Sequence, residues 1–388
     1  MCNLRNRVNI SPAFISVPLT MSIPESMKAI VFQGPFDIAT VSVPTPKVTE
    51  PTDVLLKVTY SGLCGTDLHT YRGHIKGPVG NIIGHEFMGV VVDKGSAIAS
   101  FEVGDEVLST FTVQCGSCWY CRHGYSGQCV KTNTFGKAGL PGGQAEYVRI
   151  PYAETTLIKK PANESTDDSV YVLMADIFTT GYYGAKKIVN HFKNELARGA
   201  VQQDIGDVTV LQLGLGPVGL CALRALKHFG FKKIVCLDSV PQRLEEARRL
   251  GAFKTINFQS EPDALADFIV KNTEGGIGFD AVLEVVGASQ ALRTAYDSVR
   301  GNGFISSIGM PHDALPFTGL ECYLKNVNIS FGRCHAWSLF HEALEVFEKL
   351  KKDFESFIDC KILVDEAKHG FEIFDAHKVN KVVFDFTK

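Results

Sequence analysis

A chain of 388 residues that is 45% hydrophobic and 21% charged is long enough for two folded domains and too apolar to be disordered. Its net charge of −3, without a long block of lysine or arginine, disfavours a nucleic acid or an anionic membrane as partner. It has no apolar run of about 18 residues that would span a membrane. The 11 cysteines, without a clear secretory signal, favour a reducing compartment where several of them bind metal.

Residues 1–27 are expected to form a disordered leader. This segment contains Arg5 and Arg7, several serines and no acidic residue before Glu25, a composition also typical of mitochondrial targeting segments. Two compartments are therefore compatible with the sequence. A cytoplasmic protein is favoured, and a mitochondrial one is the alternative.

The first half of the chain, from residue 28 to about residue 182, is predicted to be an irregular and mainly β domain. Short apolar runs separated by glycine-containing turns are typical of strands. The expected strands cover residues 28–32, 53–58, 88–92, 106–109 and 145–150. Loops between such strands are where catalytic groups are usually presented.

Two motifs in these loops carry metal-ligand side chains, Cys64-Gly-Thr-Asp-Leu-His69 and Gly84-His85-Glu86. The thiolate of Cys64 and the imidazole of His85 are good zinc ligands. Two ligands do not complete a tetrahedral site, so a third must come from elsewhere, and the fourth position should stay open for water or substrate. Taken alone, a buried free cysteine and a core histidine would be the commoner explanation.

A second metal site is predicted from four closely spaced cysteines, Cys115, Cys118, Cys121 and Cys129. Four thiolates close the tetrahedral shell around one zinc ion and leave no exchangeable position, so this site should be structural. A nucleic-acid zinc finger is disfavoured, because the segment lacks a following recognition helix and has few basic residues.

The second half, from about residue 183 to residue 330, alternates strand-like runs with helical segments. The expected strands are 208–213, 234–237, 255–258, 281–286, 304–308 and 327–331, and the expected helices are 220–229, 243–250, 264–271 and 290–300. Six strands alternating with helices predict a Rossmann α/β fold, a doubly wound parallel sheet with helices on both faces.

A dinucleotide-binding motif follows the first of these strands. Gly214, Gly216 and Gly219 stand between a strand and a helix, where glycines let the backbone approach a pyrophosphate. Asp238 ends the next strand and can accept hydrogen bonds from the adenosine ribose hydroxyls. This carboxylate would repel a 2′-phosphate, so NAD is favoured, although nearby Arg243 leaves NADP open. Gly219 is also explained by helix and sheet packing alone.

With these motifs, residues 28–386 resemble the zinc-containing medium-chain alcohol dehydrogenase family. Within that family, the segments 142–152 (GGQAEYVRIPY) and 175–184 (ADIFTTGYYG) are most similar to the formaldehyde-dehydrogenase-like branch. The resemblance implies an α/β protein with a GroES-like irregular β catalytic domain and a six-stranded Rossmann coenzyme domain. The first would comprise residues 28–182 and 331–388, and the second residues 183–330.

The resemblance also implies the metal ligands. Asp176 stands where most of the family has a cysteine, and the resembling branch uses an aspartate there as the third ligand beside Cys64 and His85. A carboxylate is a competent zinc ligand. The alternative for Asp176 is a helix N-cap. Glu86 would lie behind the metal and ligate it transiently.

The same resemblance assigns the neighbouring residues. Thr66 would hydrogen-bond the alcohol, His69 would pass its proton to solvent, and Asp67 would orient the imidazole of His85. Further expected positions are Thr180 against the nicotinamide, Arg243 near the adenosine ribose, Lys381 near the pyrophosphate, and Phe111 and Ile75 in the substrate pocket. For Lys381 and Arg243 a solvated surface position is an equal alternative.

The predicted function is NAD-linked, two-zinc oxidation of an alcohol or hydrated aldehyde by reversible hydride transfer. An NADP-linked ketone or aldehyde reductase is the alternative within this class, and a catalytically silent zinc protein is the alternative outside it. The expected partner is a small molecule, and the expected assembly is a homodimer or homotetramer. Residues 190–206 are longer than the family usually has, which predicts an extended helix or a subunit contact.

Overall fold

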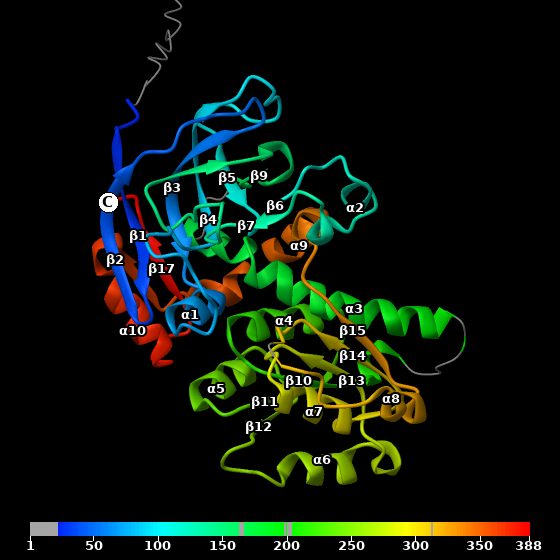
Figure 1. Ribbon diagram of the computed structural model, residues 1–388. Helices are drawn as coiled ribbons and strands as arrows, with labels where there is room; N and C mark the ends of the chain where they lie inside the picture. The colour runs from blue at the N-terminus through cyan, green and yellow to red at the C-terminus, as the bar shows by residue number, and fades with distance from the viewer. Residues whose placement is uncertain (1–21, 163–166, 198, 200–203, 312) are drawn as a thin grey trace, which may run out of the picture.

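The computed structural model describes residues 22–162, 167–197, 199, 204–311 and 313–388 (Figure 1). It has a β half, which lies in the upper part of Figure 1, and a Rossmann half, which lies in the lower part. The predicted leader lies largely outside the described residues. The first strand, β1 (Ser26–Gly34), begins two residues before the expected start at residue 28.

The β half is built around a seven-stranded sheet in the order β16-β17-β3-β4-β5-β9, with β8 paired to β3. These strands are β3 (Val54–Gly62), β4 (Glu86–Lys94), β5 (Glu106–Ser109), β8 (Tyr147–Ile150), β9 (Leu157–Lys159), β16 (Cys360–Leu363) and β17 (Val382–Asp385). Two small antiparallel pairs accompany them, β1 with β2 (Asp37–Pro44) and β6 (Thr112–Val113) with β7 (Asn133–Thr134). The end of the chain returns to this half, since β17 pairs with β3.

The Rossmann half is a six-stranded parallel sheet in the order β12-β11-β10-β13-β14-β15. Its strands are β10 (Thr209–Leu213), β11 (Lys233–Asp238), β12 (Lys254–Asn257), β13 (Phe279–Glu284), β14 (Val299–Ser307) and β15 (Asn328–Phe331). The helices of this half are α4 (Pro217–His228), α5 (Pro241–Arg249), α6 (Ala264–Asn272), α7 (Ser289–Ser298) and α8 (Gly319–Lys325). All six predicted strands are present, and their order is the dinucleotide-binding arrangement, so the predicted fold is confirmed.

Two helices join the halves, α3 (Ile177–Ala197) and α9 (Ala336–Leu350), and both lie between the halves in Figure 1. Phe178 of α3 packs edge-to-face on Phe347 of α9 at 4.9 Å between ring centroids. One apolar cluster contains Cys64 of the β half, these two phenylalanines and Leu220 of α4. The two halves therefore share a continuous core. Helix α3 extends to Ala197 and so includes the first part of the segment 190–206.

The β half also holds three shorter helices, α1 (Gly65–Tyr71), α2 (Trp119–Arg122) and α10 (Ala367–Asp375). None of the helices in the described ranges is long and apolar enough to cross a membrane.

Candidate active site

The first metal-ligand motif lies at the junction of β3 and α1. Cys64 precedes α1 with extended backbone angles (φ −107°, ψ 155°). The backbone N–H of Cys64 donates a hydrogen bond to the Asp67 carboxylate at 3.0 Å. An acid in the first turn is stabilised there by the unpaired N–H groups of the helix N-terminus. This local structure holds Cys64, which is 5% exposed, in the buried part of the site.

His85 enters the same site from the start of β4. Gly84 before it has φ +92°, and a Cβ there would lie 2.3 Å from the Gln144 side chain, so this position requires glycine. The His85 Nδ1 is 3.4 Å from Asp67 Oδ1, and its Nε2 is 3.3 Å from Asp176 Oδ2. The second carboxylate is thus at the ring nitrogen that faces the cluster.

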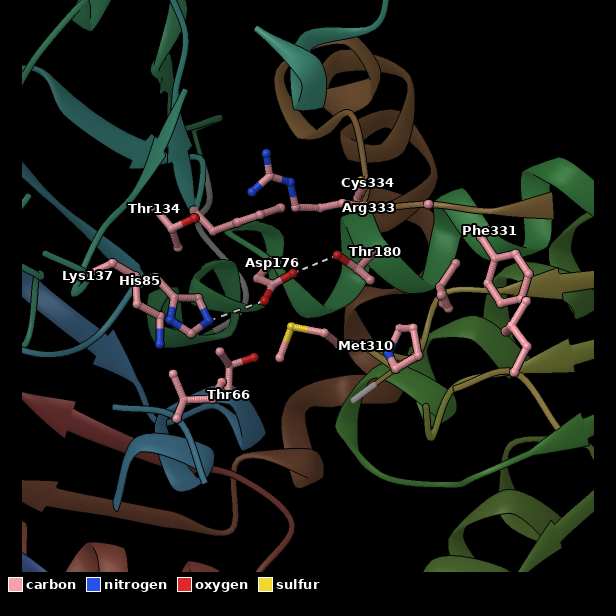
Figure 2. Close-up of a pocket in the computed structure, with 17 residues that line it drawn as sticks. Thr66, His85, Thr134, Lys137, Asp176, Thr180, Met310, Phe331, Arg333 and Cys334 are labelled. Carbon is pink, nitrogen blue, oxygen red and sulfur yellow. Dashed lines mark hydrogen bonds and ion pairs between the residues drawn. The ribbon is translucent and has the colours of Figure 1, made fainter. Parts of the chain in front are cut away.

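Asp176 comes from the residue before α3, more than 90 positions after His85 in the sequence. Its Oδ1 accepts a hydrogen bond from the Thr180 hydroxyl at 2.6 Å, and its Oδ2 lies 3.8 Å from the Cys64 sulfur. Figure 2 shows the carboxylate directed at His85 and Thr180. This orientation favours the ligand role over the alternative role as a helix cap.

The fourth member, Glu86, is fully buried behind these residues. Its Oε1 has no hydrogen-bond partner among the described residues, and its Oε2 pairs with the Lys381 ammonium. Burial raises the pKa of Glu86, although Lys381 opposes this effect. A buried carboxylate oxygen without a partner is costly unless a cation lies near it.

The donor atoms of Cys64, His85, Glu86 and Asp176 all lie within 4.8 Å of one another. Burial opposes a charged His85, but the Asp67 carboxylate and the Cys64 thiolate outweigh burial and raise its pKa well above the ordinary value. The cluster therefore attracts positive charge. One sulfur, one imidazole nitrogen and one carboxylate oxygen form a donor set that fits a catalytic zinc ion with an open position.

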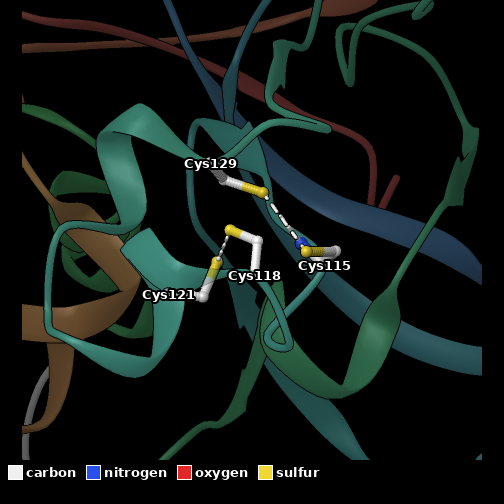
Figure 3. A group of neighbouring side chains, drawn as sticks. All are labelled: Cys115, Cys118, Cys121 and Cys129. Carbon is white, nitrogen blue, oxygen red and sulfur yellow. Dashed lines mark hydrogen bonds between the residues drawn. The ribbon is translucent and has the colours of Figure 1, made fainter.

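The second cysteine group forms a separate site (Figure 3), in which the sulfurs of Cys115, Cys118, Cys121 and Cys129 lie within 4.8 Å of one another. Backbone N–H groups point at these sulfurs. The N–H of Cys115 donates to the Cys129 sulfur at 3.2 Å, and N–H donors at Cys121 and Val130 lower the pKa of Cys118 to about 6. Such donors stabilise thiolates, which bind metal. The geometry fits the predicted structural zinc site.

A cavity of about 530 Å³ opens in front of the Cys64–His85–Asp176 cluster. The predicted site residues Thr66, Thr180, Phe111 and Ile75 all line it. His69 does not line it and instead lies beside His74, with 5.9 Å between ring centroids.

A second cavity, of about 650 Å³, lies at the carboxyl ends of the Rossmann strands and is lined by Gly214, Gly216, Asp238 and Arg243. Asp238 accepts hydrogen bonds from the backbone N–H groups of Leu215, Ser239 and Val240 at 2.7–2.9 Å. Its carboxylate is thereby held at the edge of the cavity, where the ribose of a dinucleotide binds in this fold.

Gly219 does not line this cavity, and its need for glycine is a packing need. A Cβ at Gly219 would lie 2.2 Å from the Gly214 carbonyl oxygen. The packing alternative considered for Gly219 therefore describes its position.

The prediction for Lys381 needs correction. Its ammonium is completely buried, donates to the Leu63 carbonyl at 3.0 Å and pairs with Glu86. Lys381 lines neither the second cavity nor the protein surface, so it lies behind the metal cluster and not at the pyrophosphate. A buried carboxylate such as that of Glu86 is stable only beside a buried cation, and Lys381 is that cation.

Sequence reasoning missed several residues that line the first cavity, among them Lys137, Arg333, Met310, Leu315 and Cys334. They lie in loops after β7, β14 and β15. Arg333 could have been found, because it follows the last parallel strand, and the carboxyl ends of such strands border ligand sites.

A Rossmann sheet, a dinucleotide-type cavity and a zinc-type donor cluster beside it define the class of zinc-dependent dehydrogenases. Comparison with known proteins agrees with this class. Residues 50–162 match the family described as "Alcohol dehydrogenase GroES-like domain", and residues 217–349 match "Zinc-binding dehydrogenase".

Individual relatives cover nearly the whole chain. "Zinc-type alcohol dehydrogenase B" of Aspergillus flavus is 43% identical, over 97% of this chain and 85% of that protein. "Uncharacterized zinc-type alcohol dehydrogenase-like protein AdhB" of Bacillus subtilis is 30% identical, over 90% and 97%. The solved structure of alcohol dehydrogenase TADH from Thermus sp. ATN1 is 31% identical, with a TM-score of 0.81 over 92% of this chain and 99% of that one.

The chain therefore belongs to the zinc-type medium-chain alcohol dehydrogenase family, as its sequence motifs predicted. Members of this family are oxidoreductases that act on CH–OH groups.

Proposed function

We propose that this protein is a zinc-dependent alcohol dehydrogenase that transfers hydride reversibly between an alcohol, or a hydrated aldehyde, and NAD. The observation that supports it most is the Cys64–His85–Asp176 cluster. Its members His85 and Asp176 line one cavity together with Thr180 and residues after the Rossmann strands. An alcohol at the cluster and a nicotinamide beside Thr180 would share this cavity. Holding two reactants in contact is a large part of enzymatic rate enhancement.

The zinc ion held by this cluster would supply Lewis-acid chemistry that lowers the pKa of the alcohol hydroxyl. Thr66 would hydrogen-bond the alcohol hydroxyl and release its own proton as it accepts the alcohol's, and His69 would pass that proton to solvent. The bound coenzyme would supply the hydride acceptor, so that the products would be a carbonyl compound, reduced coenzyme and one released proton. Asp67 holds His85 Nδ1, so that Nε2 faces the cluster.

We propose NAD as the preferred coenzyme. The Asp238 carboxylate, held by three backbone N–H groups, would accept the ribose hydroxyls and repel a 2′-phosphate. Arg243 lines the same cavity and lies 3.2 Å from His377 Nδ1. It is the feature that would favour the alternative, an NADP-linked reductase.

Several further proposals follow from the same features. The two donor groups support two zinc ions per chain, one of them structural. Aspartate in the third ligand position supports the formaldehyde-dehydrogenase-like branch. The described cysteines are unpaired thiols, which supports a reducing compartment such as the cytoplasm. We retain 28–182 with 331–388 as the catalytic domain and 183–330 as the coenzyme domain.

A homodimer is the assembly we propose. Strand β15 is at the edge of the Rossmann sheet, and an exposed edge strand readily pairs with another chain. Beside it, α8 exposes Leu320, Tyr323 and Leu324 at 66–76% of their surface. Light scattering would test this proposal, and a monomer at micromolar concentration would contradict it.

The central experiment measures zinc content and coenzyme reduction on wild type and Asp176→Ala. The variant should lose about one zinc equivalent and its turnover while it keeps its circular dichroism spectrum. Asp167→Ala, which removes an exposed partner of Lys361, is the matched control and should keep both metals. A wild type that binds only one zinc and oxidises no alcohol with NAD or NADP would refute the proposal and favour a catalytically silent zinc protein.

A further inference from the structure

The cavity in front of the metal cluster is mainly apolar but carries two cationic side chains. Lys137, in the loop after β7, and Arg333, in the segment between β15 and α9, both line it. Figure 2 shows them entering from opposite sides, with Lys137 near Thr134 and His85, and Arg333 near Cys334. The apolar wall comprises Ile75, Phe111, Ile308, Met310, Leu315 and Phe331.

Each cation is held in place by a neutral oxygen. The Lys137 ammonium donates to the Thr70 hydroxyl at 3.2 Å, and the Arg333 guanidinium donates to the Gly127 carbonyl at 2.6 Å. Neither side chain forms an ion pair with any acid in the described part of the chain. Lys137 contributes to lowering the pKa of Asp67, but that carboxylate already pairs with His85. Both cations are therefore positioned without being neutralised.

The cavity itself offers no compensating acid. Among the described residues that line it, Asp176 is the only carboxylate, and it belongs to the metal cluster. Arg333 is exposed to solvent while it lines the cavity. Two cations that line one cavity without an acidic partner give it a positive potential, which favours an anionic ligand.

The donor geometry indicates what such a ligand looks like. A guanidinium has five N–H donors in a planar fork that matches a carboxylate or a phosphate, and the Gly127 carbonyl uses one side of it. A lysine across the cavity adds a second point charge. The apolar wall suits the hydrocarbon part of a ligand that ends at the metal cluster.

We propose that the alcohol oxidised by this enzyme carries an anionic group, carboxylate or phosphate, at the end remote from the hydroxyl, bound by Arg333 and Lys137. The inference rests on the proposed function, because it places the hydroxyl at the Cys64–His85–Asp176 cluster. A neutral alcohol would contact the apolar wall but leave both cations unpaired.

The test compares ω-hydroxy acids of increasing chain length, each against the n-alcohol of the same length, and diol monophosphates as the phosphate arm. The substrates are run on wild type, Arg333→Met, Lys137→Met and the double variant. At the best length, wild type should prefer an anionic substrate in kcat/KM, and each single variant should lower the anionic-to-neutral ratio by about tenfold or more. Lys271→Met, which removes an exposed lysine of α6, is the control and should leave this ratio unchanged.

A binding measurement separates this inference from the proposed function. Calorimetry with unreactive alkanoates and alkyl phosphates, on the zinc-loaded protein with NAD, should show binding that weakens with salt and is lost in the double variant. If wild type turns over neutral alcohols equally well and the variants keep that ratio, the inference is wrong and the proposed function stands. If no alcohol reacts, the calorimetry decides: binding lost in the double variant supports the anion site, and equal or absent binding overturns it.

Discussion

Replacing Asp67 by asparagine tests the support of the catalytic metal site. The carboxylate uses both oxygens, one as acceptor for the Cys64 backbone N–H at 3.0 Å and one at 3.4 Å from His85 Nδ1. Asparagine keeps the size but has only one carbonyl oxygen. If that oxygen stays with Cys64, its NH₂ group faces the Nδ1–H of His85, and two donors oppose each other. The imidazole then loses the acceptor that holds Nε2 toward the metal.

The size of the effect follows from this conflict. Loss of a residue that orients a metal ligand typically costs about 10–100-fold in metal affinity or activity. We expect Asp67→Asn to reach the upper end, about 100-fold weaker binding of the catalytic zinc, because it loses a charge as well as an acceptor. A chelator titration with zinc quantified at each step should resolve two classes of zinc. Only the weaker class should shift, since the four-cysteine site is separate.

Asp385→Asn is the matched control, because Asp385 is 5% exposed and Asp67 is 6% exposed. The Asp385 carboxylate accepts hydrogen bonds from Thr387 and pairs with Lys388, both at the end of the chain. It should leave both zinc affinities unchanged. A catalytic-zinc affinity for Asp67→Asn within about threefold of wild type would refute the positioning argument, because no orienting role would then remain.

Three further predictions follow. Cys121→Ser should release the structural zinc and lower the melting temperature while the catalytic zinc stays bound, as measured by metal analysis with differential scanning calorimetry; loss of both metals would contradict two separate sites. Asp238→Ala should raise the KM for NAD about tenfold and that for NADP by less, and equal increases would contradict the role in coenzyme choice. Burial opposes ionisation of Asp280, but the hydrogen bond from the Thr209 N–H and the Arg300 charge outweigh burial and lower the pKa of Asp280. The ionised Asp280 therefore stabilises the fold above the carboxyl pKa of the unfolded chain, and this stabilisation is lost as pH falls through the lower pKa of the folded protein. Asp280→Asn should therefore lower the free energy of unfolding by about 1.5–3 kcal/mol at neutral pH and by progressively less in acid, and a pH-independent loss would contradict this sign.

The sequence carried most of the information on the Rossmann half. Strands buried on both faces appear as apolar runs, and each run here is followed by a helix, so the element order alone predicts the sheet. The β half was predicted less completely. Strands such as β6, β9 and β16 are short and irregular, and their pairing depends on distant segments. Strand β16 has no strong local signal in the sequence, so its place beside β17 depends on tertiary contacts.

The metal site divides along the same line. The local motifs indicated Cys64 and His85, and the close spacing of four cysteines in the sequence predicted the proposed structural zinc site. Asp176 came only from family resemblance, because an aspartate before a helix is most simply a cap. Lys381 was misplaced, since nothing local indicates that a lysine near the end of the chain faces the carboxylate of Glu86.

Helix α3 explains why these distant residues act together. Asp176 precedes it, Thr180 in its first turn donates to that carboxylate at 2.6 Å and lines the cavity, and Phe178 between them packs into the core shared by both halves. The proposed metal ligand, the proposed nicotinamide contact and a core residue are therefore positioned by a single turn of helix. A shift of α3 relative to either half would move ligand and coenzyme contact together, and the packing of Phe178 against Phe347 and Phe354 opposes such a shift.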